Sequence, residues 1–145
     1  MSAEGIPLPA LLRAARGAYG GEVRRRLAEG GFDDLPRNGP FVLGGMANQG
    51  VAASDLIPQL GVSKQATGQL VDTLVLRGYL VRETNPDDRR RLDLLLTERG
   101  HAAAAEVRAA VVSVNERLAR KIGGEGMSAL RDGLVALIEI REEDE

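Results

Sequence analysis

Three consecutive arginines, Arg89, Arg90 and Arg91, directly follow the tetrapeptide Asn-Pro-Asp-Asp at residues 85–88. Asn and Asp side chains bond their own backbone and Pro presets φ, so this tetrapeptide predicts a tight turn. Guanidinium groups at the edge of a hairpin can contact phosphates or enter a narrow minor groove of duplex DNA. A solvated charged turn is the simpler explanation of an isolated arginine run. The residues before the run decide between the two, and they favour DNA contact.

Those residues predict a short helix with one polar face. Ser63 can cap it, because its hydroxyl accepts a free N–H of the first turn. Ala66, Leu70 and Leu74 recur at helical spacing, and Arg77-Gly78 is a suitable end because glycine adopts the left-handed conformation. The opposite face is rich in hydrogen-bonding side chains: Lys64, Gln65, Thr67, Gln69, Asp72 and Thr73.

Four of these side chains are candidate DNA contacts. Gln can pair with an adenine edge and Thr can touch a thymine methyl group, so we assign Gln65 and Thr67 to bases. Lys64 and Gln69 are assigned to phosphates, and the free N–H groups that follow Ser63 can also bind a phosphate. The alternative is that glutamine is common at exposed helix positions in any protein and has no such role here.

A two-stranded ribbon is predicted after this helix. Residues 79–84 alternate weakly and contain Val and Tyr, and residues 92–96 are apolar and compatible with a strand. A helix followed directly by such a ribbon is a winged helix-turn-helix, a module that usually binds duplex DNA. The predicted fold class is therefore mainly α with a small β-wing.

Residues 61–100, GVSKQATGQLVDTLVLRGYLVRETNPDDRRRLDLLLTERG, closely resemble the MarR family of bacterial transcriptional regulators. The most specific signature is NPDDRR, a strand and then LTERG, where members typically show an Asp-x-x-Asp-Arg-Arg wing followed by Leu-Thr-x-x-Gly. The resemblance extends over nearly the whole chain. It implies a homodimer with two such modules, which binds a near-palindrome and is usually released by a small ligand or by oxidation.

The resemblance also implies roles within the wing. Asp88 would brace the wing, and Arg90 would be the minor-groove probe. Asn85 stands where many members have Asp, and we expect it still to serve the turn. Arg82 is expected to pair with a wing aspartate, a structural role that we favour over DNA contact.

A ligand site follows from the resemblance alone. In the family, a cleft between the dimer helices and the DNA-binding lobe binds small, often aromatic, anions. Arg16, Tyr19 and Phe41 could line such a cleft. For Tyr19 and Phe41, an ordinary position in the core is the favoured alternative.

The N-terminal segments predict three further helices. The first is expected from residue 8, with Pro9 in its first turn, to just before Gly30-Gly31. The second covers residues 40–47 and ends in a turn at residues 48–50; its Gly44-Gly45 pair either permits close packing, which we favour, or leaves space for a ligand. The third, at residues 52–60, should be short or bent because Pro58 lacks an N–H.

The C-terminal part predicts a long helix capped by Thr97, a stop at Gly123-Gly124 and a last helix over residues 127–140. Its narrow apolar seams suit another helix and exceed what a monomer of this size needs, so we infer a homodimer built from the first and last helices. The predicted interface residues are Leu8, Leu11, Leu12, Val114, Leu118, Leu134 and Ile138. Residues 1–145 are predicted to form one domain, with dimerisation helices over roughly 8–30 and 98–141 and a winged helix-turn-helix lobe over roughly 36–97.

Composition narrows the function classes. The formal net charge is −2, but the four acidic residues at the end contribute −4, which leaves +2 for residues 1–141. DNA affinity would therefore depend on where the arginines stand. The absence of cysteine removes disulfides, thiolate metal sites and oxidant sensing by cysteine. No apolar run is long enough to span a membrane and no signal pattern is visible, so a cytoplasmic protein is expected.

Enzyme chemistry has little support in the sequence. His101 is the only histidine and is expected to be an ordinary surface residue, and no metal cluster or phosphate-binding glycine loop is visible, so no metal or cofactor is expected. The resulting hypothesis is a ligand-responsive homodimeric repressor of a palindromic operator. Its expected partners are double-stranded DNA, a second copy and, as an option, a small aromatic or anionic ligand. The alternatives are a DNA-binding regulator without a small-molecule effector and a helical protein-interaction module.

Overall fold

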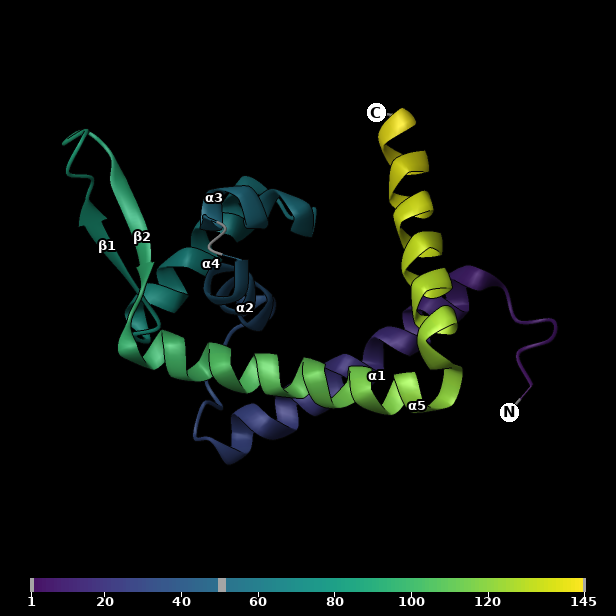
Figure 1. The fold of residues 1–145 in the computed structure, drawn as a ribbon. Coiled ribbons are helices and arrows are strands. Elements are labelled where there is room, and N and C mark those ends of the chain that lie inside the picture. The colour runs from purple at the N-terminus through teal and green to yellow at the C-terminus, as the bar shows by residue number, and fades with distance from the viewer. Residues whose placement is uncertain (1, 50–51, 145) are drawn as a thin grey trace. The chain divides into compact units, whose positions relative to one another are not determined.

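The computed structural model describes residues 2–49 and 52–144 (Figure 1). Its elements are, in order, α1 (Leu8–Glu29), α2 (Gly39–Gln49), α3 (Ala53–Leu56), the 3-10 segment η1 (Ile57–Leu60), α4 (Lys64–Leu76), β1 (Leu80–Thr84), β2 (Leu92–Leu96) and α5 (Glu98–Glu143). β1 and β2 pair antiparallel, which confirms the predicted class, mainly α with a small β-wing. The chain divides into two compact units, Met1–Val111 and Val112–Glu145, and α5 contributes to both.

The helices before α4 largely follow the prediction. α1 ends before Gly31, whose φ of 83° is the left-handed conformation that glycine favours. α2 continues through residues 48 and 49, where a turn was predicted; the third residue of that turn lies outside the described residues. Pro58 has the expected effect, because α3 is a single turn and the chain continues as η1.

α4 has a capped beginning and a defined end. Ser63 Oγ accepts a hydrogen bond from the backbone N–H of Ala66 at 3.1 Å, so the predicted cap is confirmed. At the other end Gly78 has a φ of 80°, and the N–H groups of Gly78 and Tyr79 donate to the carbonyls of Val75 and Leu74 at 3.0 and 2.9 Å. These two bonds form a Schellman motif, which fixes how α4 turns into β1.

The core of the Met1–Val111 unit joins the end of α1, α2, η1, α4, β1 and the start of α5. Its buried residues are Leu27, Val42, Leu43, Ile57, Leu70, Leu74, Tyr79, Leu80, Ala103, Ala104 and Val107. Each fully buried Val or Leu contributes about 1.5–3 kcal/mol. Gly45 lets α2 approach α3, since a Cβ there would lie 2.6 Å from Leu56 Cδ1. For this glycine the favoured prediction, close packing, is confirmed.

In the Val112–Glu145 unit, α5 is interrupted at Gly123, where φ is 71° and ψ is 177°. The stop predicted at Gly123-Gly124 is therefore a break after which the helix resumes directly. Several large apolar side chains of this second segment are exposed: Leu130, Leu134, Val135, Leu137, Ile138 and Ile140. Among the described residues, none of the helices has both the length and the apolar character needed to cross a membrane.

Candidate nucleic-acid interface

The wing consists of β1, β2 and the turn between them, with the strands paired from Leu80↔Leu96 to Thr84↔Leu92. Asn85 organises the turn, as predicted. Its Oδ1 accepts the backbone N–H groups of Asp87 at 2.8 Å and Asp88 at 3.1 Å. Its Nδ2 donates to Asp93 Oδ2 at 2.9 Å, which ties the turn to β2.

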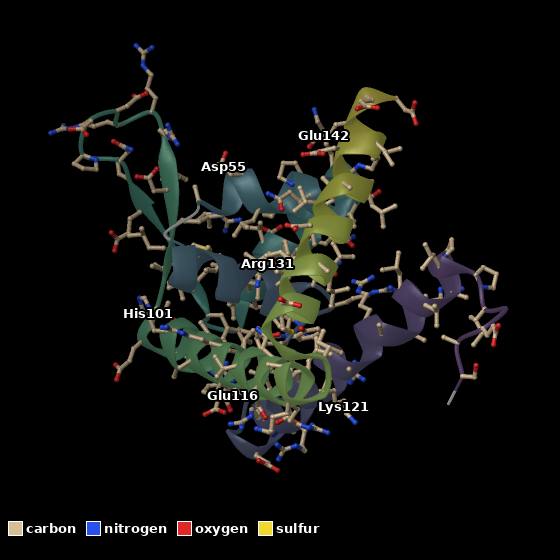
Figure 2. The ribbon with its side chains drawn as sticks, turned by 45° about the vertical axis from the view of Figure 1, so that its right-hand side comes forward. Asp55, His101, Glu116, Lys121, Arg131 and Glu142 are labelled. Atoms are coloured by element: carbon tan, nitrogen blue, oxygen red, sulfur yellow. The ribbon has the colours of Figure 1, made fainter. Side chains whose placement is uncertain are left out.

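The three arginines that follow the turn differ in whether their side chains have a partner within the chain. The Arg91 side chain is paired, because its Nε lies 3.5 Å from Asp93 Oδ1. The backbone N–H of Arg91 also donates to the Asp88 carbonyl at 3.0 Å. Arg89 and Arg90 are exposed, and their guanidinium groups have no acceptor within the described part of the chain. Asp88 Oδ1 accepts the backbone N–H of Arg90 at 3.1 Å, a contact that would brace the turn. In Figure 2 the side chains at the hairpin tip, several ending in nitrogen, extend away from the ribbon.

α4 presents a polar face to solvent. Three of its exposed side chains are spaced four and three residues apart and so share one face: Gln65, Gln69 and Asp72. Lys64 is also exposed. Thr67, assigned to a base from the sequence, is half-buried and stands three and seven residues before Leu70 and Leu74, which are buried. It therefore lies toward the core side of α4 and is less accessible than Gln65.

Arg82 connects the wing to this polar face. Its Nη2 lies 2.6 Å from Asp72 Oδ1 on α4. The prediction that Arg82 pairs with a wing aspartate is wrong, because Arg82 lies midway along β1, the strand that packs against α4. The pair places β1 beside the face that carries Gln65 and Gln69. The positive charge of Arg82 also compensates the Asp72 carboxylate, which would otherwise repel DNA phosphates.

The base of the wing is closed by Thr97 and Gly100. Thr97 Oγ1 accepts the Gly100 N–H at 3.0 Å, which confirms the predicted cap of α5, and it donates to the carbonyl of Gly78 at 2.5 Å. Gly100 is buried, and a Cβ at this position would overlap the carbonyl oxygen of Tyr79. Glycine thus lets the first turn of α5 rest directly on the turn that follows α4. This packing gives a physical reason for the Leu-Thr-x-x-Gly signature.

Four side chains meet at the same base, a cluster that was not predicted: Asp34, Arg77, Tyr79 and Arg99. Arg99 Nη2 donates to Asp34 Oδ1 at 3.1 Å, and its Nη1 donates to the Arg77 carbonyl. Its guanidinium carbon stands 4.3 Å from the centre of the Tyr79 ring. The Tyr79 hydroxyl donates to Asp34 Oδ1, and Arg77 Nη1 donates to the Asp34 carbonyl. We call these four residues the Asp34 cluster.

The cluster shifts the pKa of two of its members. Burial, and then the hydrogen bond to Asp34, raise the pKa of Tyr79 from 10.0 to about 12. The Tyr79 hydroxyl, and after it the Arg99 charge, holds the pKa of Asp34 below its usual value although burial opposes this. At neutral pH the cluster therefore combines a carboxylate, two guanidinium groups and a neutral phenol.

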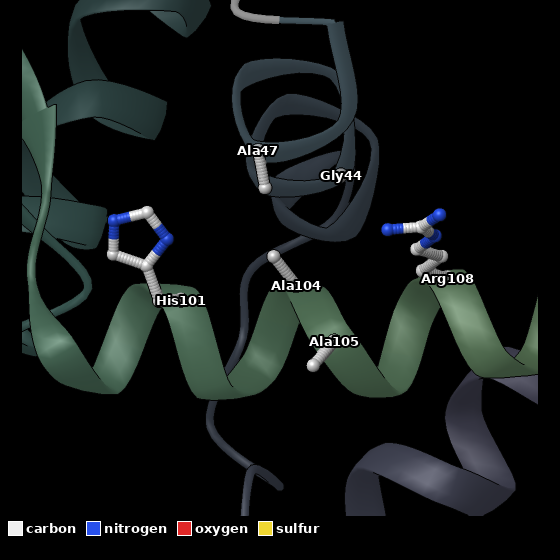
Figure 3. A pocket seen from close by; sticks show the side chains of 6 residues that line it. All are labelled: Gly44, Ala47, His101, Ala104, Ala105 and Arg108. Carbon is white, nitrogen blue, oxygen red and sulfur yellow. The ribbon is translucent and has the colours of Figure 1, made fainter.

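A cavity of about 150 Å³ lies between α2 and α5. Its lining residues are Gly44, Ala47, His101, Ala104, Ala105 and Arg108. Figure 3 shows His101 and Arg108 projecting from α5 toward α2 on either side of Ala104. His101 is exposed, as expected, but it borders a cavity, which the sequence does not indicate because α2 is distant along the chain.

The residues predicted for the ligand cleft do not line this cavity. Arg16 is exposed and Tyr19 half-buried on α1, while Phe41 on α2 is 44% exposed. Phe41 is therefore not the core residue that was the favoured alternative. Among the described residues, no group of three or more His, Asp and Glu side chains is arranged to hold a metal ion.

The predicted interface residues are incompletely covered within one chain. Leu11, Val114 and Leu118 are half-buried, while four others are exposed: Leu8, Leu12, Leu134 and Ile138.

The sequence model of the MarR family matches residues 34–91, from the start of the Asp34 cluster to the last wing arginine. Over these residues, the chain is similar to the MarR family. The transcriptional repressor MprA of Escherichia coli (strain K12) is 38% identical over 60 residues, which cover 41% of this chain and 34% of MprA. The chain spans about half the length of other curated relatives that it matches.

Solved structures extend the likeness beyond the segment that the MarR-family model matches. The transcriptional regulator Tm0710 from Thermotoga maritima is 27% identical, with 95% of this chain and 96% of that chain covered and a TM-score of 0.56. The transcriptional repressor CouR, bound to a 23-mer DNA duplex, is 24% identical, with the same coverage and a TM-score of 0.70. The winged-helix fold is therefore shared over nearly the whole length.

Proposed function

We propose that this protein is a transcriptional regulator that binds duplex DNA through α4 and the wing. The observation that carries the proposal is the pair of exposed wing-tip arginines, Arg89 and Arg90, which have no acceptor among the described residues, while Arg91 is paired. Free guanidinium groups at the tip of a hairpin suit phosphates and the minor groove. MprA and CouR, to which the chain is similar, are named transcriptional repressors, which supports repression and action in the bacterial cytoplasm.

Within this proposal the exposed face of α4 enters the major groove. Gln65 is the first candidate to pair with a base edge, and Thr67, being half-buried, is a weaker one. Lys64 and Gln69 approach phosphates, and the first turn that Ser63 caps offers its remaining N–H groups. Because Arg82 ties β1 to the same face through Asp72, the wing and α4 would meet one duplex together.

We infer that the active form is a homodimer. Leu134 and Ile138 are 39% and 53% exposed on α5, and a second copy would bury such side chains. Two-fold pairing would present two copies of α4 to half-sites about 34–36 Å apart, and the operator would then be near-palindromic.

The cavity between α2 and α5 is our candidate effector site. Its volume of about 150 Å³ is close to that of a cavity able to hold one benzene ring. Arg108 at its rim would pair with an anionic group, so the favoured ligand is a small monocyclic carboxylate. A ligand that prefers one arrangement of the dimer would shift the spacing of the two α4 helices and so the DNA affinity.

A series of variants tests the DNA-binding surface. Arg90→Ala should weaken binding of a duplex enriched by the protein itself by about 1–3 kcal/mol, because a DNA contact is lost. Gln65→Ala should change sequence preference more than overall affinity. Arg120→Ala, an exposed α5 residue outside the proposed surface, is the control. Unchanged binding by both surface variants in a mobility-shift series would favour the alternative function, a protein-interaction module.

A further inference from the structure

Arg99 occupies a position that the family signature leaves open, the second variable residue of Leu-Thr-x-x-Gly. We propose that Arg99 is a positioning residue for DNA binding: it fixes the base of the wing relative to α4, so that the wing tip and the polar face of α4 reach one duplex together. This role rests on the DNA-binding function proposed above.

Arg99 joins three separate parts of the Met1–Val111 unit. Its guanidinium donates to Asp34, in the segment between α1 and α2, and to the carbonyl of Arg77, which caps the end of α4. It also stacks on the ring of Tyr79, the residue directly before β1. Tyr79 is fully buried, so its ring cannot shift without opening the core. The contact between Arg99 and Tyr79 therefore ties Arg99 to a fixed point of the core.

The position of the wing tip depends strongly on the orientation of the wing base. β1 contains five residues, which span roughly 17 Å at the rise of a strand, and the arginines lie beyond its far end. A rotation of about 10° at the base would move the tip by roughly 3 Å, whereas functional groups must be held within about 10–20° and a fraction of an ångström. A small change beside Tyr79 can therefore remove contacts made by Arg89 and Arg90.

The chemistry of the cluster requires a guanidinium group. Its planar fork donates to Asp34 and to the Arg77 carbonyl at once while its face covers the Tyr79 ring. An ammonium is a point charge on a flexible stem and cannot make these three contacts together. Arg99→Lys should thus keep the charge and lose the positioning.

The experiment compares wild type, Arg99→Lys, Arg99→Ala and the control Arg120→Ala. The probe is a duplex that the wild-type protein enriches from a random-sequence library, and its affinity is measured by fluorescence anisotropy across a series of KCl concentrations. Each lost phosphate contact lowers the slope of log affinity against log salt by about 0.9, so both Arg99 variants should show a slope lower by roughly one to two. Hydrogen exchange of the same proteins without DNA should become faster over residues 80–96 and stay unchanged over residues 101–110.

The outcomes separate a positioning role from mere stability. A lower melting temperature with an unchanged salt slope and unchanged exchange in residues 80–96 would overturn the positioning role. If the wild-type protein enriches no duplex, the proposed function fails, and the exchange of residues 80–96 still decides whether Arg99 holds the wing base. If Arg99→Ala does not fold, Arg99→Lys provides the same comparisons.

Discussion

Replacing Gly100 by alanine measures how closely α5 rests on the turn after α4. The added Cβ would overlap the Tyr79 carbonyl oxygen and stand 3.1 Å from Leu96 Cδ2. Relief requires the first turn of α5 to move away, which stretches the 3.1 Å hydrogen bond from the Thr97 backbone N–H to that oxygen. Overpacking costs about 1–3 kcal/mol and a weakened hydrogen bond about 0.5–1.5 kcal/mol, so we expect the free energy of unfolding to fall by roughly 1.5–4.5 kcal/mol.

The assay is thermal unfolding followed by far-UV circular dichroism, at one protein concentration because the stability of a dimer depends on it. At roughly 2–4 °C per kcal/mol, the midpoint of Gly100→Ala should fall by about 10 °C. Gly68→Ala is the matched control, since an added Cβ on this exposed residue of α4 has no neighbour within 4 Å. It should leave stability unchanged or raise it by up to about 1 kcal/mol. A Gly100→Ala protein as stable as the wild type would refute the close packing of α5 on Tyr79.

Three further perturbations follow from named contacts. Ser63→Ala removes the cap that binds the Ala66 N–H and should lower the free energy of unfolding by about 1 kcal/mol in a urea titration, whereas an unchanged midpoint would deny the cap. The folded state favours the protonated phenol of Tyr79, whose pKa is raised from 10.0 to about 12. The contribution of this phenol to the free energy of unfolding is therefore complete below pH 10 and is lost as the pH rises toward about 12. Tyr79→Phe should therefore be less stable than wild type at pH 9, and this difference should shrink as the pH rises toward 12; a constant difference would contradict the shifted pKa. Leu134→Glu places a charge at an exposed apolar position and should yield monomers in sedimentation velocity, where a persistent dimer would exclude this residue from the interface.

The parts of the fold that follow from the sequence are set by neighbours along the chain. Ser63 caps the helix that begins one residue later, and Asn85 bonds the backbone two and three residues ahead. Pro58 shortens its helix because it lacks its own N–H. In each case the residue type and a short spacing determine the geometry, so a single sequence is sufficient.

The parts that could not be predicted depend on contacts between distant segments. Arg99 and Asp34 are 65 residues apart, and neither residue type nor spacing indicates that they meet. The partner of Arg82 was wrong for the same reason, because the packing of β1 on α4 decides which carboxylate is near. The cavity beside His101 likewise exists only once α2 and α5 are packed together.

The most direct test of DNA recognition by α4 and the wing is selection of bound duplexes from a random-sequence library, followed by footprinting of the enriched sequence. We predict a near-palindrome with two protected half-sites about 34–36 Å apart, whose affinity falls steeply as salt rises. A library that shows no enrichment even at low salt would contradict the account.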